Sequence, residues 1–246
     1  MSSIPVALQM WSVRDDFNTD FAATVKKVAA IGYSAVELAG YGNLSAADAA
    51  AALREAGLRV VGMHVGLDRL QTELDAVLSE ARMFESPFIT CPYYDKSKFK
   101  TAKDGAALGG ILNGIGAAVR EAGLRFAYHN HDGEFQKIEG RFVMDWILDA
   151  AEPRNLEMEL DVYWSTVAGA DTPAWLRGAG RRTTQIHLKD VEELGASGKV
   201  DFPAILQAVA GIGAAEVFII EQEKYNHAPL ESVRLSLEAF RSWGRA

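Results

Sequence analysis

The sequence predicts a single α/β domain, a (β/α)8 or TIM barrel that spans residues 1–246. Eight short apolar runs rich in β-branched residues recur, with centres roughly 25 to 37 residues apart, the length of one strand, one helix and two loops. Helical patterns separate most of these runs, and no linker interrupts them. Eight strand-then-helix units in 246 residues favour a closed barrel over an open sheet.

The predicted strands, in chain order, are the apolar segments 5–11, 34–40, 59–65, 87–93, 125–131, 156–164, 184–190 and 216–223. The predicted helices have apolar residues at helical spacing and lie at 20–32, 45–57, 67–84, 108–123, 201–213 and 230–244, the last of which closes the barrel. Several helices end in a glycine, as expected where a left-handed residue closes a helix: Gly32, Gly57, Gly123 and Gly213.

An open doubly wound sheet is the alternative fold. Such a sheet would carry a glycine-rich phosphate-binding turn after its first strand. Residues 12–18, SVRDDFN, hold that position and contain no G-x-G-x-x-G pattern. The sequence therefore disfavours a dinucleotide-binding fold.

Composition and charge narrow the function classes. Lys and Arg number 25 against 33 Asp and Glu, a net charge of -8, so neither nucleic acid nor an anionic membrane is an expected partner. Neither a basic leader nor a run of roughly 18 apolar residues is present, which predicts a cytoplasmic protein. Cys91 is the single cysteine, which excludes an internal disulfide and a cysteine-rich zinc site. A metal site would have to use His, Asp and Glu.

Polar residues in the predicted strands mark the candidate site. A barrel strand is buried on both faces, so a charged residue on it is costly unless it is paired or bound to a metal. In TQIHLKD every second residue is polar, which puts Gln185, His187 and Lys189 on one face. The same alternation selects residues of other strands: Gln9, Glu37, His64, Glu159, Asp161 and Glu221. Most lie near the C-terminal ends of their strands, where active sites of this fold are built.

Asp161, His187 and Glu221 come from three successive predicted strands at matching depth. They offer a mixed carboxylate and imidazole set without sulfur, which suits Mn²⁺, Mg²⁺, Zn²⁺ or Fe²⁺. We therefore predict that this trio binds a divalent metal.

The other candidates are predicted to contact the substrate: Glu37, His64, Trp11, Trp164 and Lys189. Each has a structural alternative. His64 could be a hydrogen-bonded core histidine, Glu37 a group that orients a loop, and the tryptophans ordinary packing. Lys189 could form a salt bridge with Asp190.

Glu159 lies two positions deeper than Asp161 on its strand. A buried carboxylate paired with Arg125 or with a histidine is as good an interpretation there as direct catalysis.

Eight segments together resemble the xylose isomerase-like barrels, also described as sugar phosphate isomerase/epimerases or the AP endonuclease family 2 superfamily. In order, over nearly the whole chain, they are LQMWSVRD, GYSAVELAGYG, GMHVGLDRL, YHNHDGEF, LDVYWSTVAGADTPAW, QIHLKD, VDFPAIL and FIIEQEK. The ordered set is specific for the superfamily and much less specific for the reaction.

The resemblance implies one divalent metal, with Mn²⁺ favoured and Mg²⁺, Zn²⁺, Fe²⁺ or Co²⁺ as alternatives. In that family the ligands are a Glu from strand five, an Asp from strand six, a His from strand seven and a Glu from strand eight. Asp161, His187 and Glu221 match the last three. In the ketose epimerases of the family the two glutamates also move the proton next to the carbonyl, which makes Glu221 the leading candidate base.

The fifth predicted strand departs from the family pattern. His129 stands where the epimerases have the ligand glutamate, and Glu134 follows only after an Asp-Gly pair. We favour Glu134 as the fourth ligand and second acid-base group, because the glycine before it lets the chain turn back. The alternatives are that His129 takes the coordination position or that strand five gives no ligand. If Glu134 does not reach the metal, His131 becomes the better second acid-base group, since an imidazole titrates near neutrality.

These features predict a divalent-metal-dependent isomerase or epimerase of a small sugar or polyol, working through an enediolate. The alternatives are a lyase or dehydratase of keto-sugars or keto-inositols and a non-catalytic sugar-binding barrel. The DNA-repair branch of the superfamily is disfavoured, because it needs ligands for three zinc ions and a cationic groove, and this chain has five histidines and net negative charge. No phosphate-cradling glycine motif supports a phosphorylated substrate. Loops that contain tyrosine could contact a second subunit, so a homo-oligomer is possible.

Overall fold

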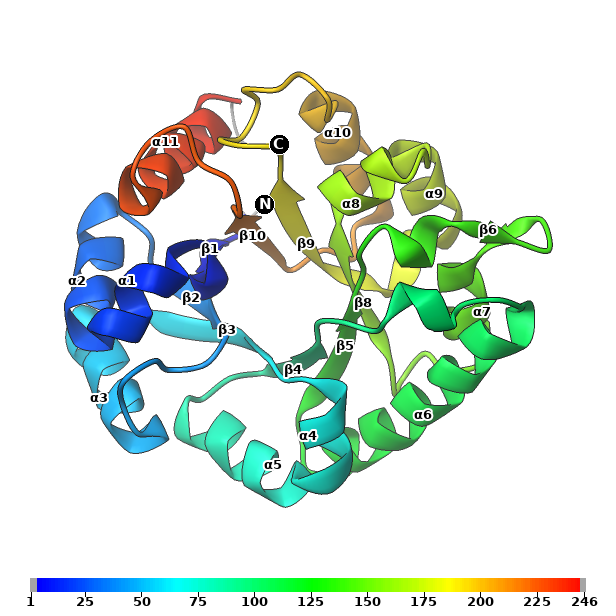
Figure 1. Ribbon diagram of the computed structural model, residues 1–246, viewed down its shortest axis with the longest axis horizontal. Helices are drawn as coiled ribbons and strands as arrows, with labels where there is room; N and C mark the ends of the chain where they lie inside the picture. Colours follow the sequence, from blue (N-terminus) through cyan, green and yellow to red (C-terminus); the bar gives the residue numbers. More distant parts are fainter. Residues whose placement is uncertain (1–3, 244–246) are drawn as a thin grey trace.

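The computed structural model describes residues 4–243. Eight parallel strands close into a barrel, and the helices form a ring outside it (Figure 1). Around the barrel the strands are β1 (Val6–Gln9), β10 (Val217–Glu221), β9 (Thr183–Lys189), β8 (Glu157–Asp161), β5 (Arg125–His129), β4 (Phe88–Cys91), β3 (Arg59–His64) and β2 (Ala35–Leu38). The predicted (β/α)8 barrel is confirmed.

The α-helices are α1 (Arg14–Thr19), α2 (Phe21–Ile31), α3 (Ala46–Ala56), α4 (Leu67–Thr72), α5 (Leu74–Met83), α6 (Ala102–Glu121), α7 (Val143–Asp149), α8 (Val162–Val167), α9 (Thr172–Ala179), α10 (Phe202–Ile212) and α11 (Pro229–Ser242). Shorter elements lie in the loops: the 3₁₀ helices η1 (Met10–Val13), η2 (Lys96–Lys98), η3 (Gly133–Phe135) and η4 (Gly180–Arg182), and a hairpin of β6 (Lys137–Ile138) and β7 (Arg141–Phe142).

Two helical segments differ from their predicted bounds. The segment 67–84 forms α4 and α5, which meet at Glu73, whose φ of -135° departs from helical geometry. Helix α6 begins at Ala102 instead of residue 108, because Asp104 accepts hydrogen bonds from the backbone N–H and the hydroxyl of Thr101 and so caps the helix start. Polar capping residues thus extend the helix beyond its apolar pattern.

The predicted helix ends are confirmed by backbone geometry. Gly32, Gly57 and Gly213 follow α2, α3 and α10 with φ of 112°, 73° and 63°, the left-handed region that glycine adopts without strain. The predicted closing helix corresponds to α11, and its last predicted residue, Gly244, lies outside the described residues.

The barrel interior has an apolar floor and a polar upper layer. The floor is a cluster of small and branched side chains near the strand starts: Ala7, Ala35, Val217 and Ile219. Toward the carboxyl ends the inward residues become polar, and the register pairs Glu221 with Lys189 across β10 and β9. On the opposite face of β9, Ile186 and Leu188 are fully buried in the main core, so the predicted alternation of this strand is confirmed.

Among the described residues, none of the helices combines the length and the apolar character that crossing a membrane requires.

Candidate metal centre and active site

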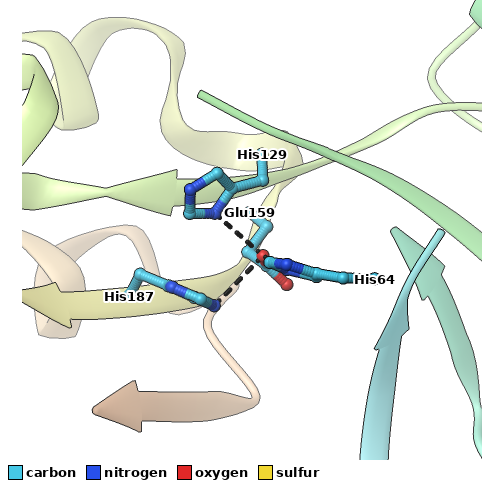
Figure 2. Close-up of side chains that lie close together, drawn as sticks. All are labelled: His64, His129, Glu159 and His187. Atoms are coloured by element: carbon cyan, nitrogen blue, oxygen red, sulfur yellow. Dashed lines mark hydrogen bonds and ion pairs between the residues drawn. The ribbon is translucent and has the colours of Figure 1, made fainter. Parts of the chain in front are cut away.

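The carboxyl ends of neighbouring strands bring buried polar side chains together inside the barrel. The parallel register sets His129 of β5 beside Glu159 of β8, and Asp161 of β8 beside His187 of β9. Figure 2 shows the imidazoles of His64, His129 and His187 converging on the Glu159 carboxylate. Two layers can be distinguished, an upper group around Asp161 and a deeper group around Glu159.

The upper group consists of His129, Asp161, His187 and Glu221, whose potential ligand atoms all lie within 4.8 Å of one another. Asp161 Oδ1 accepts the Trp164 backbone N–H at 2.9 Å and caps α8. Its other oxygen, Oδ2, is buried, finds no hydrogen-bond partner among residues 4–243, and lies 4.0 Å from His129 Nε2. Because divalent metals bind N and O at about 2.0–2.2 Å, this unpartnered oxygen and the gap beside it fit a bound cation.

The deeper group centres on Glu159. Its Oε1 lies 3.0 Å from His129 Nδ1, 3.1 Å from His187 Nε2 and 2.7 Å from His64 Nε2. These are ordinary hydrogen-bond lengths, so the deeper group is satisfied without an ion, unlike Asp161 Oδ2. Of the two partners predicted for Glu159, histidine is the one observed, whereas Arg125 pairs instead with Glu157 at 2.6 Å.

The deeper group also sets the orientation of the imidazoles above it. An ionised carboxylate only accepts, so the nitrogens facing Glu159 carry the hydrogens. His129 Nε2 is then left as a lone pair on the side of the upper group, whereas His187 Nδ1 lies 3.2 Å from Glu221 Oε2 and donates to it when the ring is protonated. A metal-binding histidine is commonly held in this way by a carboxylate at its other nitrogen.

Glu37 belongs to the same buried layer. Its Oε2 lies 2.8 Å from His187 Nε2 and accepts the Gln9 side-chain N–H at 2.7 Å. A Cβ atom at Gly62 would lie 2.6 Å from Glu37 Oε1, so the neighbouring strand must carry a glycine there. Glu37 therefore lies beneath the upper group, and its predicted contact with substrate stays a prediction.

The two carboxylates of the upper group, Asp161 and Glu221, differ in how their surroundings shift their pKa values. Burial raises the pKa of Asp161 to about 7, and the nearby Glu221 adds to this. Burial also favours the neutral form of Glu221, but Lys189 and His187 hold its pKa well below the ordinary value. Lys189 Nζ lies 3.7 Å from Glu221 Oε2 and 3.0 Å from Glu223 Oε1. The alternative partner considered for Lys189 was Asp190, which accepts backbone N–H groups of its own loop instead.

The histidines differ in their proton affinity. Burial lowers the pKa of His129 to about 3 and that of His131 to about 4, so both offer nitrogen lone pairs at neutral pH. Burial opposes protonation of His64 as well, but Glu37 and Glu159 raise its pKa to about 10. The pKa of His187 is also raised, chiefly by Glu159 against the effect of burial. A cation at His187 Nδ1 would compete with that second proton.

Glu134 does not join either group. Its Oε1 accepts the Tyr128 hydroxyl at 2.6 Å, and its Oε2 accepts the His131 backbone N–H at 2.8 Å. The chain turns back after Gly133 as expected, but it returns to its own strand. Among the described residues, the strand-five member of the upper group is His129, the alternative that the sequence left open.

A cavity of about 310 Å³ opens at the upper group, lined by residues that include Trp11, His64, Tyr93, His129, Glu221 and Glu223. Of the residues predicted to contact substrate, Trp11 and His64 line this cavity. Trp164 and Lys189 lie nearby, with Lys189 Nζ 4.9 Å from the centre of the Trp164 ring, which packs against His131 at 5.4 Å. A larger cavity of about 530 Å³ lies near the strand starts, around Arg59 and Pro87, and contains none of the predicted site residues.

Asn130 is a site residue that sequence reasoning did not assign. Its Oδ1 accepts the Asp161 backbone N–H at 2.9 Å, and its Nδ2 donates to the Asp161 carbonyl at 3.3 Å. The side chain thus continues the pairing of β5 and β8 beyond their last paired residues, His129 and Glu159. The sequence showed only that an asparagine follows the fifth strand directly. Asparagine is common in turns, so its position there did not indicate a role in the site.

Comparison with solved structures confirms the architecture. A sugar phosphate isomerase/epimerase from Parabacteroides distasonis superposes with a TM-score of 0.88 at 20% identity, covering 99% of this chain and 96% of that one. An L-ribulose 3-epimerase gives 0.76 at 13% identity, with 97% and 93% covered. A probable 3-DHS dehydratase from Bacillus anthracis gives 0.74 at 13% identity, with 96% and 98% covered.

No curated protein matches the chain at the sequence level. A family model described as xylose isomerase-like TIM barrel matches residues 25–243. The ordered motifs, the closed eight-stranded barrel and this match agree, and the chain belongs to the xylose isomerase-like TIM barrel family.

Proposed function

We propose that this protein is a divalent-metal-dependent sugar isomerase or epimerase that removes a proton next to a carbonyl and proceeds through an enediolate. The observation that carries the proposal is the upper group, in which a buried, unpartnered Asp161 oxygen faces two imidazoles and a second carboxylate at the carboxyl end of the barrel. The substrate would be a small sugar or polyol, in keeping with the neighbours that are named as epimerases.

The metal would be held by His129, Asp161, His187 and Glu221. This oxygen and nitrogen set suits Mn²⁺, Mg²⁺, Zn²⁺ or Fe²⁺, and the family resemblance favours Mn²⁺. A bound dication supplies Lewis-acid polarisation of the substrate carbonyl and stabilises the charge that develops on its oxygen. The chain's own groups must then hold the substrate and move the proton.

Glu221 and His131 are the proposed acid-base pair. Glu221 is kept ionised by Lys189 and lines the cavity, so it can accept a proton. The His131 ring is neutral at pH 7, and its Nδ1 is buried with no hydrogen-bond partner among the described residues. Glu134 accepts the His131 backbone N–H and thereby positions this imidazole instead of exchanging the proton itself. A carboxylate and an imidazole would replace the two glutamates of the related epimerases.

A lyase or dehydratase of keto-sugars is the second candidate. His131 favours it, because a neutral imidazole could take up the proton that Glu221 abstracts and pass it to a departing hydroxyl, which leaves as water. Expulsion of that β-substituent would follow the same first step, removal of the proton next to the carbonyl. A neighbour named as a probable dehydratase shares the barrel.

The test is solvent deuterium exchange with metal-loaded protein. Ketoses, 3-keto-glycosides and inosose are incubated in D₂O, and recovered material is analysed by mass spectrometry and NMR. An epimerase returns labelled ketose, whereas a lyase gives an enone or diketone. Glu221→Gln should abolish either reaction, and Glu55→Gln is the control, since this exposed carboxylate pairs with Lys26 outside the cavity. A protein that binds no divalent metal at micromolar concentration, or that exchanges no label, contradicts the proposal and leaves a non-catalytic sugar-binding barrel.

A further inference from the structure

The mouth of the catalytic cavity exposes aromatic surface to water. Five large apolar side chains stand out as exposed in the described part of the chain, and two of these are aromatic, Trp11 at 42% and Tyr93 at 56%. Both line the 310 Å³ cavity that reaches Glu221 and His129. Large apolar groups are exposed together mainly where a ligand or partner covers them.

The two rings are held in place although they are exposed. The Trp11 backbone N–H donates to Gln9 Oε1 at 3.0 Å, and the Arg14 guanidinium lies 5.1 Å from the centre of its ring. Arg14 is itself fixed by the Trp11 carbonyl and the Tyr225 hydroxyl. The Tyr93 ring meets His131 edge-on at 5.6 Å. A ring that is ordered before binding loses little conformational entropy when a ligand stacks on it.

The two rings stand on different sides of the mouth. Trp11 lies in η1, directly after β1, whereas Tyr93 follows β4, and β2 and β3 separate these strands in the barrel. A ligand that extends outward from Glu221 and His129 therefore passes between them.

Two carboxylates line the cavity, and the imidazole of His64, also in the lining, is ion-paired with Glu37 and Glu159. The two lining carboxylates are Glu221 and Glu223, and neither Lys nor Arg occurs among the described lining residues. The nearby buried cation, Lys189, has its Nζ 3.7 Å from Glu221 and 3.0 Å from Glu223 and makes no hydrogen bond among the described residues. A phosphate group would meet carboxylates here, whereas hydroxyl groups can donate to them.

Aromatic rings and acidic acceptors match the two sides of a pyranose ring, whose C–H face is apolar and whose edge carries hydroxyls. We propose that the substrate is an uncharged keto-sugar bearing a second sugar ring, and that Trp11 and Tyr93 bind this second ring. This second-ring site rests on the proposed function in one respect, namely that the reacting ring of the substrate lies at the upper group.

Three ketoses that differ only at O6 test the proposal: fructose, isomaltulose, in which O6 carries a glucose ring, and fructose 6-phosphate. Binding to Mn²⁺-loaded protein is measured by calorimetry, and solvent deuterium exchange is measured separately. We expect isomaltulose to bind about tenfold more tightly than fructose, the fold-change that two aromatic contacts supply, and fructose 6-phosphate to bind more weakly than fructose.

Variants assign the preference to the rings. Trp11→Ala and Tyr93→Ala should each reduce the affinity ratio of isomaltulose to fructose by about threefold, whereas Trp11→Phe and Tyr93→Phe should retain most of it. Ile111→Ala, which alters an exposed apolar residue on α6 outside the cavity, is the control and should leave the ratio unchanged.

Equal affinities, tighter binding of the phosphate, or no binding of isomaltulose at tens of millimolar would overturn the proposal. Its outcome is separate from that of the proposed function. A binding preference without deuterium exchange supports the second-ring site and contradicts the isomerase. Deuterium exchange without a binding preference for isomaltulose supports the isomerase and contradicts the second-ring site.

Discussion

At the site, the contacts that His129 and His187 make with buried carboxylates decide how their rings are oriented. Glu159 Oε1 accepts from His129 Nδ1 at 3.0 Å and lies 3.1 Å from His187 Nε2, which also contacts Glu37 Oε2 at 2.8 Å. The other nitrogen of each ring is thereby turned toward Asp161 and Glu221. All three imidazole contacts of Glu159 are to one oxygen, Oε1, and a glutamine at this position would lack the negative charge that holds the imidazole nitrogens there.

We therefore predict that Glu159→Gln lowers metal affinity about 10- to 100-fold while the four upper residues are intact. Glu157→Gln, two residues earlier on β8, is the matched control, because Glu157 pairs with Arg125 outside this network. Competition with a fluorescent chelator measures both constants. Equal affinities for the two variants would show that Glu159 does not orient the imidazoles.

Glu134 allows a direct test of the fifth-strand alternatives. Because its two oxygens accept from Tyr128 and from the His131 backbone, we predict that Glu134→Gln leaves metal affinity within about twofold and costs about 1–2 kcal/mol of stability. Asp161→Asn should instead lose metal affinity by at least about 100-fold. Chelator competition and urea unfolding separate the two effects, and a large loss of metal binding in Glu134→Gln would restore it as a ligand.

At the scale of elements, helix α6 fixes the segment that leads into β8. A Cβ atom at Gly116 would lie 1.7 Å from the carbonyl oxygen of Asn155, two residues before β8 begins at Glu157. Gly116 thus permits the helix to approach the backbone at Asn155 closely. A Cβ atom at Gly114, on the same helix, would have no neighbouring heavy atom within 4 Å.

Paired substitutions on α6 should have opposite signs. Gly116→Ala is expected to destabilise the protein by more than about 2 kcal/mol, because the backbone must move. Gly114→Ala is expected to stabilise it by about 0.5–1 kcal/mol through helix propensity and the entropy of the unfolded chain. Urea unfolding followed by circular dichroism measures both. Similar effects of the two changes would mean that the helix can shift away from Asn155.

At the scale of the whole molecule, four carboxylates, Glu37, Glu159, Asp161 and Glu221, are buried within one barrel in a chain of net charge -8. A cation at the upper group would offset part of their repulsion. We predict that Mn²⁺ at a hundredfold excess over its dissociation constant adds about 2.7 kcal/mol to the stability and raises the melting temperature by several degrees. The shift should grow with metal concentration and nearly vanish in Asp161→Asn. A melting temperature independent of metal would contradict the centre.

The fold was predictable because its signals are local. Alternation in TQIHLKD, glycines such as Gly32 and Gly57 after helices, and the repeating strand-helix units each act over a few residues, so they survive in the sequence. The trio Asp161, His187 and Glu221 was predictable for a related reason. Parallel strands of one barrel end at the same face, so position within a strand gives depth.

The sequence by itself thus determined the barrel, the end at which the site lies and three members of the upper group. Tertiary structure alone decided the fourth member, because His129 and Glu134 differ in where the chain runs after β5, and both fit the same motif. It also decided the partners of Glu159. His64 is 95 residues away from Glu159, and their 2.7 Å contact across the barrel depends on closure of the whole sheet, which leaves no trace in local spacing.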